Sequence, residues 1–376
     1  MKLAIISHTP HYQKKGKISG WGSTVREVNH LIKLFDEIYH IAPLHSEEPP
    51  DSSIEYQSDK IKFIALKSYG GESIGQKLSI LSTAPYNLKK INSVLKNFDR
   101  EDWVQFRAPT AMGLYVLPFL KIMNKSKLWV KYAGNWKMED PPLSYRFQKW
   151  WLENNYQGAK VTINGYWEGQ KDHILDFQNP CFDKDELDRA GKIGAVKNFD
   201  GKLTLCFAGS LTPNKGVDLL LDALKMTEAK NEIEEMIFAG DGSERKKYEK
   251  AASEINMKIS FQGLLSRSEL EKVYEKSHII ILPSQSEGFP KVIAEAAAFG
   301  CVPVVSDVSS ISQYFDETKS FLLKNINASE IKMKLDIALS NRKKLKEMSL
   351  SCIKAAEIFT YEHYMDSLRS KIIFAD

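Results

Sequence analysis

Short apolar stretches alternate with amphipathic helical patterns along most of the 376-residue chain, and this alternation limits the possible folds more than any other feature. In the first half, strands are expected at residues 3–7, 37–42, 62–66, 103–106 and 128–132. Helices are expected at 23–35, 79–98 and 111–123, and Pro85 is a candidate for a break in the second helix. The alternation predicts an α/β architecture with a parallel sheet.

A second alternating series follows a connection at residues 176–185, which has no periodicity. Its strands are expected at 203–208, 235–239, 258–261, 278–282 and 302–305, and its helices at 217–224, 244–255, 268–275 and 290–299. The region 329–374 is mostly helical in pattern. Each half is typical of a doubly wound nucleotide-binding layer, so two domains are expected, with the boundary between residues 178 and 179.

The composition excludes several classes of protein. Apolar residues make up 43% and charged residues 27% of the chain, as in ordinary globular proteins, and a net charge of +4 is too weak to indicate a nucleic-acid partner. The first apolar run is too short for a signal peptide, and no stretch approaches the roughly 20 apolar residues of a membrane helix. The cysteines are far apart, without C-x-x-C spacing, which favours reduced thiols in the cytoplasm; they are Cys181, Cys206, Cys301 and Cys352.

Two glutamates, Glu287 and Glu295, stand eight residues apart in the run SEGFPKVIAE. The wholly apolar stretch 279–282 before them predicts a buried strand, and small side chains after them predict a helix. Glu287 is expected on the strand-to-helix loop, and Glu295 about two turns into the helix, with Pro290 in the first turn. Free N–H groups at a helix start suit a phosphate, and a buried carboxylate suits a pair of sugar hydroxyls. The run therefore predicts a site for a sugar nucleotide.

Three further loops come directly after predicted strands, at 209–216, 240–242 and 263–265. In the first, Lys215 is expected beside a helix start, where it could neutralise a diphosphate. Each loop by itself also fits an ordinary strand-to-helix connection or a tight glycine turn. Because ligands of open α/β sheets bind at the carboxyl ends of the strands, four such loops on one edge indicate a binding site more strongly than any one of them.

At these loops the second half resembles the donor domain of the family 4 retaining glycosyltransferases, which have the GT-B fold. The similarity is close over residues 201–330, and it rests on 209–216, 240–242, 261–263 and the glutamate run; the first half matches in layout and in Gly20-Trp21-Gly22. The resemblance implies an α/β fold of two doubly wound Rossmann-like domains that face each other across a cleft. Residues 1–178 would bind the acceptor and 179–355 the nucleotide-sugar donor, with a C-terminal helix, 356–376, packing back on the first domain.

The resemblance also implies roles for individual residues. Glu295 would bind the donor ribose, Glu287 the transferred sugar and Lys215 the diphosphate. The candidate catalytic residues are Glu287, Lys215 and Arg107. The candidate donor-binding residues are Gly209, Ser210, Lys215, Gly240, Gly263, Leu264, Glu287, Gly288, Phe289, Pro290, Lys291 and Glu295.

Two departures from the family pattern bear on the chemistry. The family usually has an arginine where this chain has Ser210, so one cation is missing from the diphosphate site, and Lys291 or Arg107 could compensate. Arg107 follows the strand at 103–106, where many relatives carry a histidine. It is a candidate to face the donor phosphate or an anionic acceptor, with a surface arginine as the alternative.

The candidate acceptor-binding residues are expected in the glycine loop before the first helix and at strand ends of the first half. Asn135 and Trp136 follow the strand at 128–132 and suit hydrogen bonding and stacking to a sugar, although a capping asparagine and a packed tryptophan would fit the same residues. The full set of acceptor candidates is Gly20, Trp21, Gly22, Arg107, Asn135 and Trp136.

Other charged motifs have simpler interpretations. The D-x-D at 183–185 lies in the connection, away from any strand end, so its similarity to a metal-binding motif is attributed to chance. His8 and His11 have no carboxylate or cysteine partner in sequence, and no metal site is expected. The basic run at 342–346 predicts a solvated helix face, with contact to an anionic membrane surface as the alternative.

The combined prediction is a retaining, metal-independent glycosyltransferase that uses a UDP- or GDP-type sugar nucleotide and no other cofactor. The expected acceptor is a hydroxyl group of a saccharide or lipid-linked saccharide, in surface polysaccharide or glycoconjugate synthesis. The expected location is the cytoplasm or the inner face of the membrane. The alternatives are a sugar-nucleotide epimerase of the same fold and a non-catalytic nucleotide-sugar binding subunit, to which Ser210 gives weight. An NAD-dependent dehydrogenase is disfavoured, because neither half has G-x-G-x-x-G after its first strand.

Overall fold

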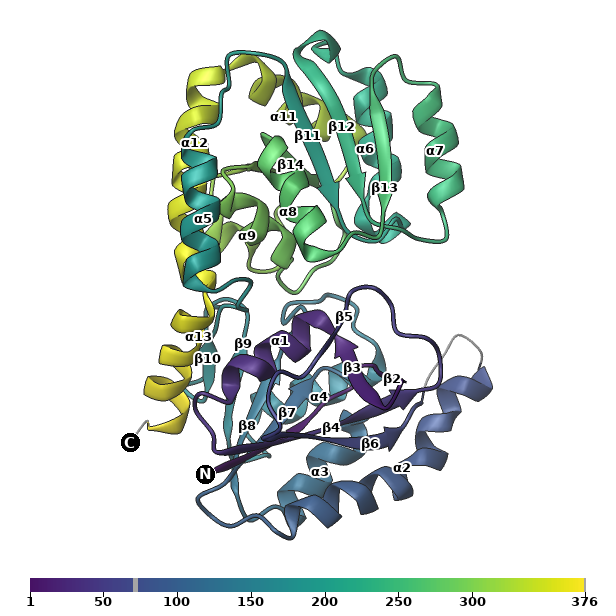
Figure 1. The fold of residues 1–376 in the computed structure, drawn as a ribbon, viewed down its shortest axis with the longest axis vertical. Coiled ribbons are helices and arrows are strands. Elements are labelled where there is room, and N and C mark those ends of the chain that lie inside the picture. The colour runs from purple at the N-terminus through teal and green to yellow at the C-terminus, as the bar shows by residue number, and fades with distance from the viewer. Residues whose placement is uncertain (70–73, 375–376) are drawn as a thin grey trace. The chain divides into compact units, whose positions relative to one another are not determined.

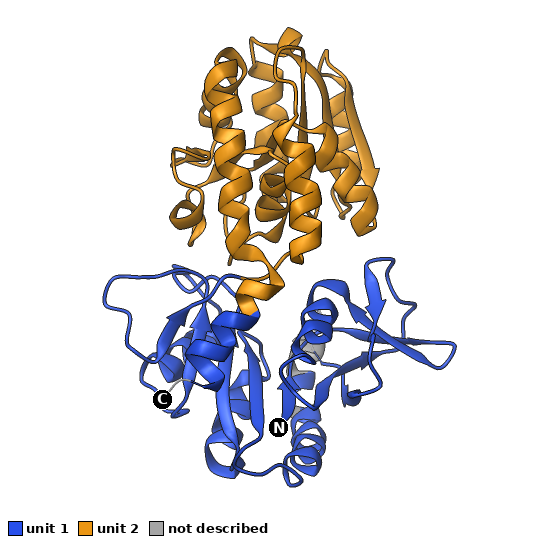
Figure 2. Ribbon diagram, turned by 60° about the vertical axis from the view of Figure 1, so that its left-hand side comes forward, with its two compact units in different colours: residues 1–178, 365–376 blue, residues 179–364 orange. Residues whose placement is uncertain are grey.

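The computed structural model describes residues 1–69 and 74–374, which divide into two compact units (Figures 1 and 2). Unit 1 comprises Met1–Gln178 and Met365–Asp376, and unit 2 comprises Asn179–Tyr364. Helix α13 (Tyr361–Leu368) begins in unit 2, and its residues from Met365 onward belong to unit 1.

Unit 1 is built on a ten-stranded sheet with the order β10-β9-β8-β7-β1-β4-β2-β3-β5, in which β6 also pairs with β4. Its strands are β1 (Lys2–Ile6), β2 (His11–Lys14), β3 (Lys17–Trp21), β4 (Glu37–His45), β5 (Ser53–Glu55), β6 (Ile61–Lys67), β7 (Trp103–Ala108), β8 (Lys127–Tyr132), β9 (Lys160–Ile163) and β10 (Ile174–Asp176). Its helices are α1 (Gly22–Leu31), α2 (Ile74–Leu95), α3 (Gly113–Met123) and α4 (Leu143–Glu153), followed after α13 by a π-helical turn, η4 (Arg369–Ile373). Strand β1 pairs in parallel with both β4 and β7, so the strand order reverses between β1 and β7.

A hairpin interrupts the alternation of strands and helices in unit 1. Strands β2 and β3 are antiparallel, β5 pairs with β3, and β2 extends the sheet beside the end of β4. The turn residues Lys15 and Gly16 both have positive φ, at 50° and 81°. The sequence does not predict these strands, because the hairpin is polar and lacks an alternating pattern. In consequence, Gly20 and Trp21 lie at the end of β3, and Gly22 begins α1.

Pro85 was expected as a possible break in the second helix, but helix α2 continues through it. The proline removes one backbone N–H, but the helix continues for about three turns beyond it. In the preceding turn, the Thr83 hydroxyl donates to the carbonyl oxygens of Ser79, at 2.9 Å, and Ile80, at 3.3 Å. These hydrogen bonds support the helix close to the proline.

Unit 2 has an all-parallel sheet with the order β13-β12-β11-β14-β15-β16. Its strands are β11 (Leu203–Ala208), β12 (Ile233–Ala239), β13 (Ile259–Gly263), β14 (Ile279–Leu282), β15 (Val302–Ser306) and β16 (Phe321–Leu323). Its helices are α5 (Lys184–Ala195), α6 (Val217–Met226), α7 (Arg245–Ser253), α8 (Arg267–Lys276), α9 (Lys291–Ala298), α10 (Ile311–Tyr314), α11 (Ala328–Ser340) and α12 (Arg342–Ala355), with short 3₁₀ turns η1 (Pro213–Lys215), η2 (Lys230–Glu232) and η3 (Ala356–Phe359). Numbered within the unit, the order is 3-2-1-4-5-6, the doubly wound order whose switch point lies between β11 and β14.

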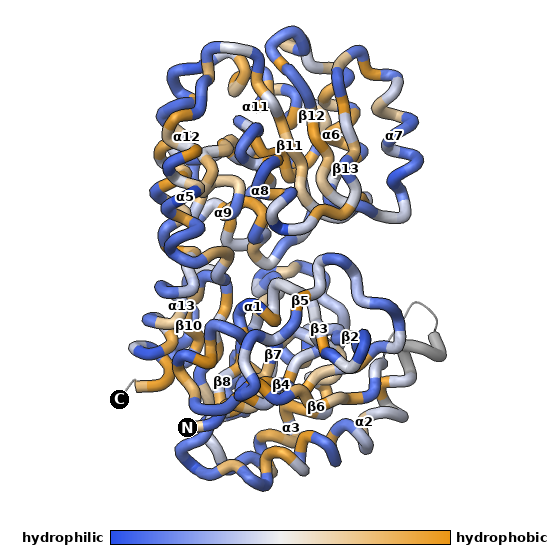
Figure 3. The backbone as a smooth tube through the Cα atoms, viewed as in Figure 1, coloured by the Kyte–Doolittle hydropathy of each residue, from blue (hydrophilic) through white to orange (hydrophobic). Residues whose placement is uncertain are grey.

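Each unit has its own hydrophobic core between sheet and helices. Every residue of β14 and β15 is buried, as expected for parallel strands covered on both faces. Figure 3 shows this contrast along the chain, with β11 and β12 largely hydrophobic and α7 largely hydrophilic. In the part of the chain that the structure describes, no helix is both long enough and apolar enough to cross a bilayer.

Candidate functional site

The loops after β11 and β14 are joined at the switch point of unit 2. The Gln285 N–H donates to the Asn214 carbonyl oxygen at 2.9 Å, and Lys215 forms an ion pair with Glu287. Gly216, the residue after Lys215, has a φ of 69°. A Cβ atom on this residue would lie 2.3 Å from the Pro283 carbonyl oxygen. Glycine is therefore required where the two loops touch.

The ion pair of Lys215 and Glu287 remains accessible to a ligand. The two side chains are 23% and 11% exposed, respectively. Lys215 ends η1, directly before Gly216 and the start of α6. An ammonium group has three N–H donors, so Lys215 can bind Glu287 and still donate to a phosphate oxygen. The structure thus brings together two predicted site residues that lie far apart in sequence.

The second glutamate, Glu295, lies closer to the helix start than the sequence pattern predicts. Helix α9 begins at Lys291, and Pro290 is its N-cap residue with φ −77° and ψ 108°, which is extended backbone. Glu295 is therefore the fifth helical residue, just over one turn into the helix rather than two. The expectation that Pro290 occupies the first turn was wrong for the same reason.

The residues between the two glutamates are held by packing and by one hydrogen bond. The Phe289 side chain is buried and stacks on Phe359, with ring centroids 4.7 Å apart. The Ser309 hydroxyl donates to the Gly288 carbonyl oxygen at 2.8 Å. The backbone of this loop is thereby fixed next to the Lys215–Glu287 pair.

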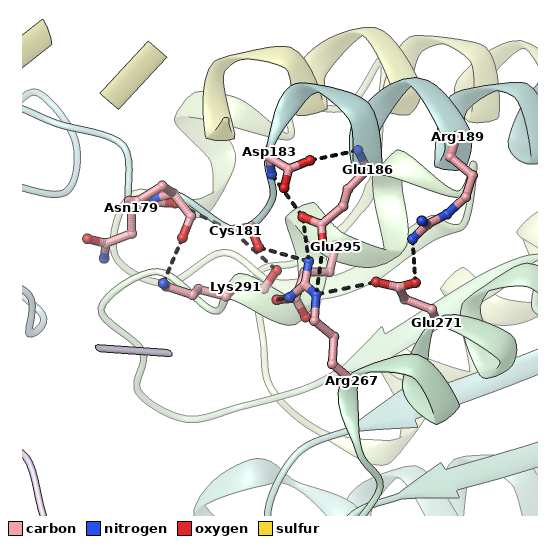
Figure 4. Close-up of polar contacts among 10 residues, drawn as sticks. Asn179, Cys181, Asp183, Glu186, Arg189, Arg267, Glu271, Lys291 and Glu295 are labelled. Atoms are coloured by element: carbon pink, nitrogen blue, oxygen red, sulfur yellow. Dashed lines mark hydrogen bonds and ion pairs between the residues drawn. The ribbon is translucent and has the colours of Figure 1, made fainter. Parts of the chain in front are cut away.

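Glu295 and Lys291 have partners that no sequence pattern predicts (Figure 4). Glu295 forms an ion pair with Arg267, the first residue of α8, at 3.5 Å. The Lys291 ammonium donates to the Pro180 carbonyl oxygen at 2.7 Å, in the connection between the two halves of the chain. This hydrogen bond directs the Lys291 charge to the connection.

The glycine loops after β11, β12 and β13 are bonded to one another. The Gly209 N–H donates to the Ala239 carbonyl oxygen at 3.0 Å, and the Gly240 N–H donates to that of Gly263 at 2.8 Å. A Cβ atom on Gly240 would lie 1.8 Å from the Gly209 carbonyl oxygen, so this glycine is needed for contact between loops. On the same edge, Ser210 is exposed and the Leu264 side chain is 68% exposed, which leaves both side chains open to a ligand.

In unit 1, Arg107 belongs to a buried charge cluster with Glu27 and Lys131. Its guanidinium donates to both Glu27 carboxylate oxygens, at 3.0 and 3.3 Å, and the Lys131 ammonium donates to the same carboxylate at 2.8 Å. The exposed fractions of the side chains are 11% for Arg107, 1% for Glu27 and 4% for Lys131. Arg107 is therefore not a surface arginine. A lysine inside the apolar stretch LWVKY was the sequence signal that could have revealed the cluster.

The other acceptor candidates are placed differently from one another. Trp136 is buried, with its ring edge-to-face against Tyr132 at 4.9 Å, and it is the packed tryptophan that the sequence also allowed. The Asn135 side chain accepts a hydrogen bond from the Lys137 N–H at 2.9 Å, as in a local turn. Trp21, in contrast, is 53% exposed.

Two residues of the remaining charged motifs, Asp183 and His11, have structural roles. Asp183 is the N-cap of α5 and forms a capping box with Glu186, with both hydrogen bonds at 2.9 Å. His11 is buried and hydrogen-bonded within unit 1. Within residues 1–69 and 74–374, no group of three or more His, Cys, Asp or Glu side chains is arranged to hold a metal ion.

Comparisons with known proteins agree with this geometry. The sequence profile of the family "Glycosyl transferases group 1" matches residues 190–357. An uncharacterized glycosyltransferase of Haemophilus influenzae is 30% identical over 180 residues, which cover 47% of this chain and 48% of that protein. The Campylobacter jejuni GalNAc-α-(1→4)-GalNAc-α-(1→3)-diNAcBac-PP-undecaprenol α-1,4-N-acetyl-D-galactosaminyltransferase is 25% identical over 181 residues, which cover 48% and 46%. The chain thus matches only about half the length of these relatives.

Among solved structures, Anabaena HepE in complex with UDP superposes with a TM-score of 0.71 at 15% identity, over 98% of each chain. With its two doubly wound units, the chain therefore has the α/β fold of the GT-B glycosyltransferases, as predicted. The group 1 glycosyltransferase model matches residues 190–357, which agrees with the resemblance drawn from the loops.

Proposed function

We propose that the chain transfers a sugar from a nucleotide-diphosphate sugar to a hydroxyl group of an acceptor, with retention at the anomeric carbon and without a metal ion. The observation that carries this proposal is the accessible Lys215–Glu287 ion pair at the switch point of unit 2. In open α/β sheets this is the place where nucleotides bind. Lys215, Glu287 and Glu295 all lie within the group 1 domain.

Glu295 and Glu287 bind the donor, and Lys215 stabilises its leaving group. Glu295 accepts hydrogen bonds from the ribose hydroxyls, and Glu287 accepts them from the transferred sugar while it orients Lys215. The Lys215 ammonium, together with N–H groups at the starts of α6 and α9, stabilises the negative charge that develops on the departing diphosphate. The departing diphosphate takes up the proton that the acceptor hydroxyl loses, so the reaction depends on positioning and electrostatics rather than on a side-chain proton relay.

We also propose the chemical class of the donor and of the acceptor. UDP is the first nucleotide to test, because HepE was solved in complex with UDP, and GDP is the second. The Campylobacter relative is named for a saccharide acceptor on PP-undecaprenol, which supports a saccharide or lipid-linked saccharide acceptor. We place the reaction in polysaccharide or glycoconjugate synthesis, in the cytoplasm or at the inner face of the membrane.

The decisive experiment measures the affinity for UDP, GDP and their sugar derivatives by calorimetry. Lys215→Ala and Glu295→Ala should each weaken binding of the preferred nucleotide about tenfold or more, since each removes charge-assisted hydrogen bonds. Lys225→Ala is the matched control, because Lys225 forms an exposed ion pair with Glu254 in the same unit. Unchanged affinity in both site variants would refute the assignment.

A second candidate function follows from Ser210. This residue is exposed and uncharged where the family usually has an arginine, which favours a subunit that binds the nucleotide sugar without turnover. Product analysis separates the possibilities. Sugar appears on an acceptor if the chain is a transferase, the donor is converted to an isomer if it is an epimerase, and the donor is recovered intact across acceptors if it only binds.

A further inference from the structure

Arg267 occupies an unusual electrostatic position for an exposed residue at the start of a helix. Its guanidinium lies 3.5 Å from the Glu295 carboxylate, 3.4 Å from that of Glu186 and 3.3 Å from that of Glu271. The three carboxylates come from α9, α5 and α8, so one side chain joins three helices. Figure 4 shows Arg267 at the centre of this network.

The network contains more negative than positive charge, which makes Arg267 important for Glu295. A second arginine, Arg189, is bound to Glu271 at 2.7 Å, so two cations face three carboxylates. Without Arg267, Glu295 and Glu186 would repel each other, and Glu295 would lose the ion pair described above. Partial desolvation by its neighbours lowers the pKa of Arg267, but the charges of Glu295, Glu186 and Glu271 outweigh this effect and raise the pKa above its ordinary value.

The same guanidinium is bonded to the connection that leads into unit 2. Arg267 donates to the Cys181 carbonyl oxygen at 3.0 Å. The next turn of chain is fixed by the capping box of Asp183 and Glu186, and Glu186 is itself a partner of Arg267. Helix α9 is bonded to this connection a second time, through Lys291 and Pro180. The helix that carries Glu295 is thus anchored at its first residue and at Glu295 itself.

We infer that Arg267 is a positioning residue that orients the Glu295 carboxylate for the ribose hydroxyls of the donor and fixes it relative to the segment 180–186. The inference rests on the proposed function, since it assigns a partner to the carboxylate that would bind the ribose. Arg267 itself need not touch the nucleotide. Its contribution therefore depends on the presence of ribose hydroxyls, and this dependence distinguishes positioning from general support of the fold.

The test compares nucleotides with and without those hydroxyls. The affinities of full-length protein for UDP and 2′,3′-dideoxy-UDP are measured by calorimetry, and GDP with its dideoxy form is used if UDP does not bind. The ratio of the two affinities reports the contribution of Glu295, and Glu295→Gln should lower it. Arg267→Ala should lower the same ratio about tenfold, mainly by weakening the ribonucleotide, and the double variant should lower it no further.

Two further variants test whether the effect depends on the charge of Arg267 and on this residue in particular. Arg267→Gln keeps a long side chain that can donate to the Cys181 carbonyl oxygen, but it lacks the charge that holds Glu295, so it should lower the ratio as alanine does. Arg189→Ala is the matched control, because it removes an arginine that binds Glu271 in the same network, and it should leave the ratio unchanged.

The outcomes separate this inference from the proposed function. If Glu295→Gln lowers the affinity ratio but Arg267→Ala leaves it unchanged, the positioning role is refuted while the donor site stands. An equal loss in Arg189→Ala would also overturn it, because the effect would then belong to the whole network. If wild-type protein binds neither UDP nor GDP, the proposed function is what fails.

Discussion

At the switch point of unit 2, Lys215 and Glu287 form an ion pair between two loops and remain 23% and 11% exposed. At the switch point of unit 1, Arg107 and Lys131 at the ends of β7 and β8 are held by Glu27, which is only 1% exposed. Both sheets reverse their strand order at these points, but the charged side chains there have different roles. The pair in unit 2 is available to a ligand, whereas the cluster in unit 1 fixes two strand ends against α1. Substitutions should therefore affect binding in unit 2 and stability in unit 1.

The strongest test of this contrast is Glu27→Gln. Removal of the carboxylate leaves two buried cations without their shared partner, which should reduce the free energy of unfolding by about 3–5 kcal/mol. Urea denaturation followed by tryptophan fluorescence measures it, because Trp103 and Trp129 are buried in unit 1. Glu48→Gln, which breaks the exposed pair with Lys14, should leave the midpoint unchanged. Equal midpoints for wild type and Glu27→Gln would mean that the cluster does not stabilise unit 1.

Unit 2 has its own stability determinant in the contact between glycine loops. Gly240→Ala places a Cβ atom 1.8 Å from the Gly209 carbonyl oxygen at a residue with φ 146°, and backbone cannot move aside as a side chain would. The expected loss is about 3 kcal/mol, at the upper end for overpacking. Gly201→Ala is the control, since nothing lies within 4 Å of its Cβ position. Calorimetric unfolding of both variants provides the comparison, and similar melting temperatures would disprove the steric argument.

A buried hydrogen-bond chain next to the cluster of unit 1 adds a dependence on pH. Ser7 and His40 Nε2 are 2.8 Å apart, His40 Nδ1 and the Tyr56 hydroxyl 2.7 Å, and that hydroxyl and His11 Nε2 2.7 Å. His11 Nδ1 lies 2.9 Å from the Thr9 carbonyl oxygen and must donate to it. When both imidazoles are neutral, Tyr56 donates to His11, His40 donates to Tyr56 and Ser7 donates to His40, so every hydrogen bond of the chain is made.

Acidification should therefore destabilise unit 1. Burial lowers the pKa of His11 to about 4, with His45 contributing, and burial, His11 and Arg107 lower the pKa of His40 despite Glu27. Below pH 6.5 the unfolded chain binds protons that the folded chain does not, so stability falls as pH decreases toward 4. His11 alone should account for about 2 kcal/mol between pH 7 and pH 5. Urea midpoints at both values should show a smaller fall in His11→Leu; an equal fall would exclude His11 as the cause.

The sequence predicted unit 2 better than unit 1 for a physical reason. In unit 2 each functional loop follows its strand directly, so an apolar run and a glycine identify its place on the sheet edge, as for Lys215 and Glu287. In unit 1 the partner of Arg107 is Glu27, which comes from a helix 80 residues earlier, and no local pattern connects the two. Arg267 was missed because an arginine after a serine N-cap is typical of an exposed helix start. The depth of Glu295 was misjudged because Pro290 fits both the N-cap and the first turn.

The smallest expected effect concerns the charge of the proposed donor site in unit 2. Because Ser210 is exposed, a cation can be added there and should strengthen nucleotide binding. Ser210→Arg should add a second cation to the proposed diphosphate site beside Lys215 and tighten UDP or GDP binding about tenfold at low salt. The gain should shrink at 0.5 M salt, because exposed charges are screened there. Ser210→Gln is the control for side-chain size. If it tightens binding as much as arginine does, or if the gain does not depend on salt, then Ser210 is not placed at the diphosphate. A salt-dependent gain for arginine alone would show that binding at unit 2 is limited by charge, in contrast to the buried cluster of unit 1, in which Glu27 holds both cations.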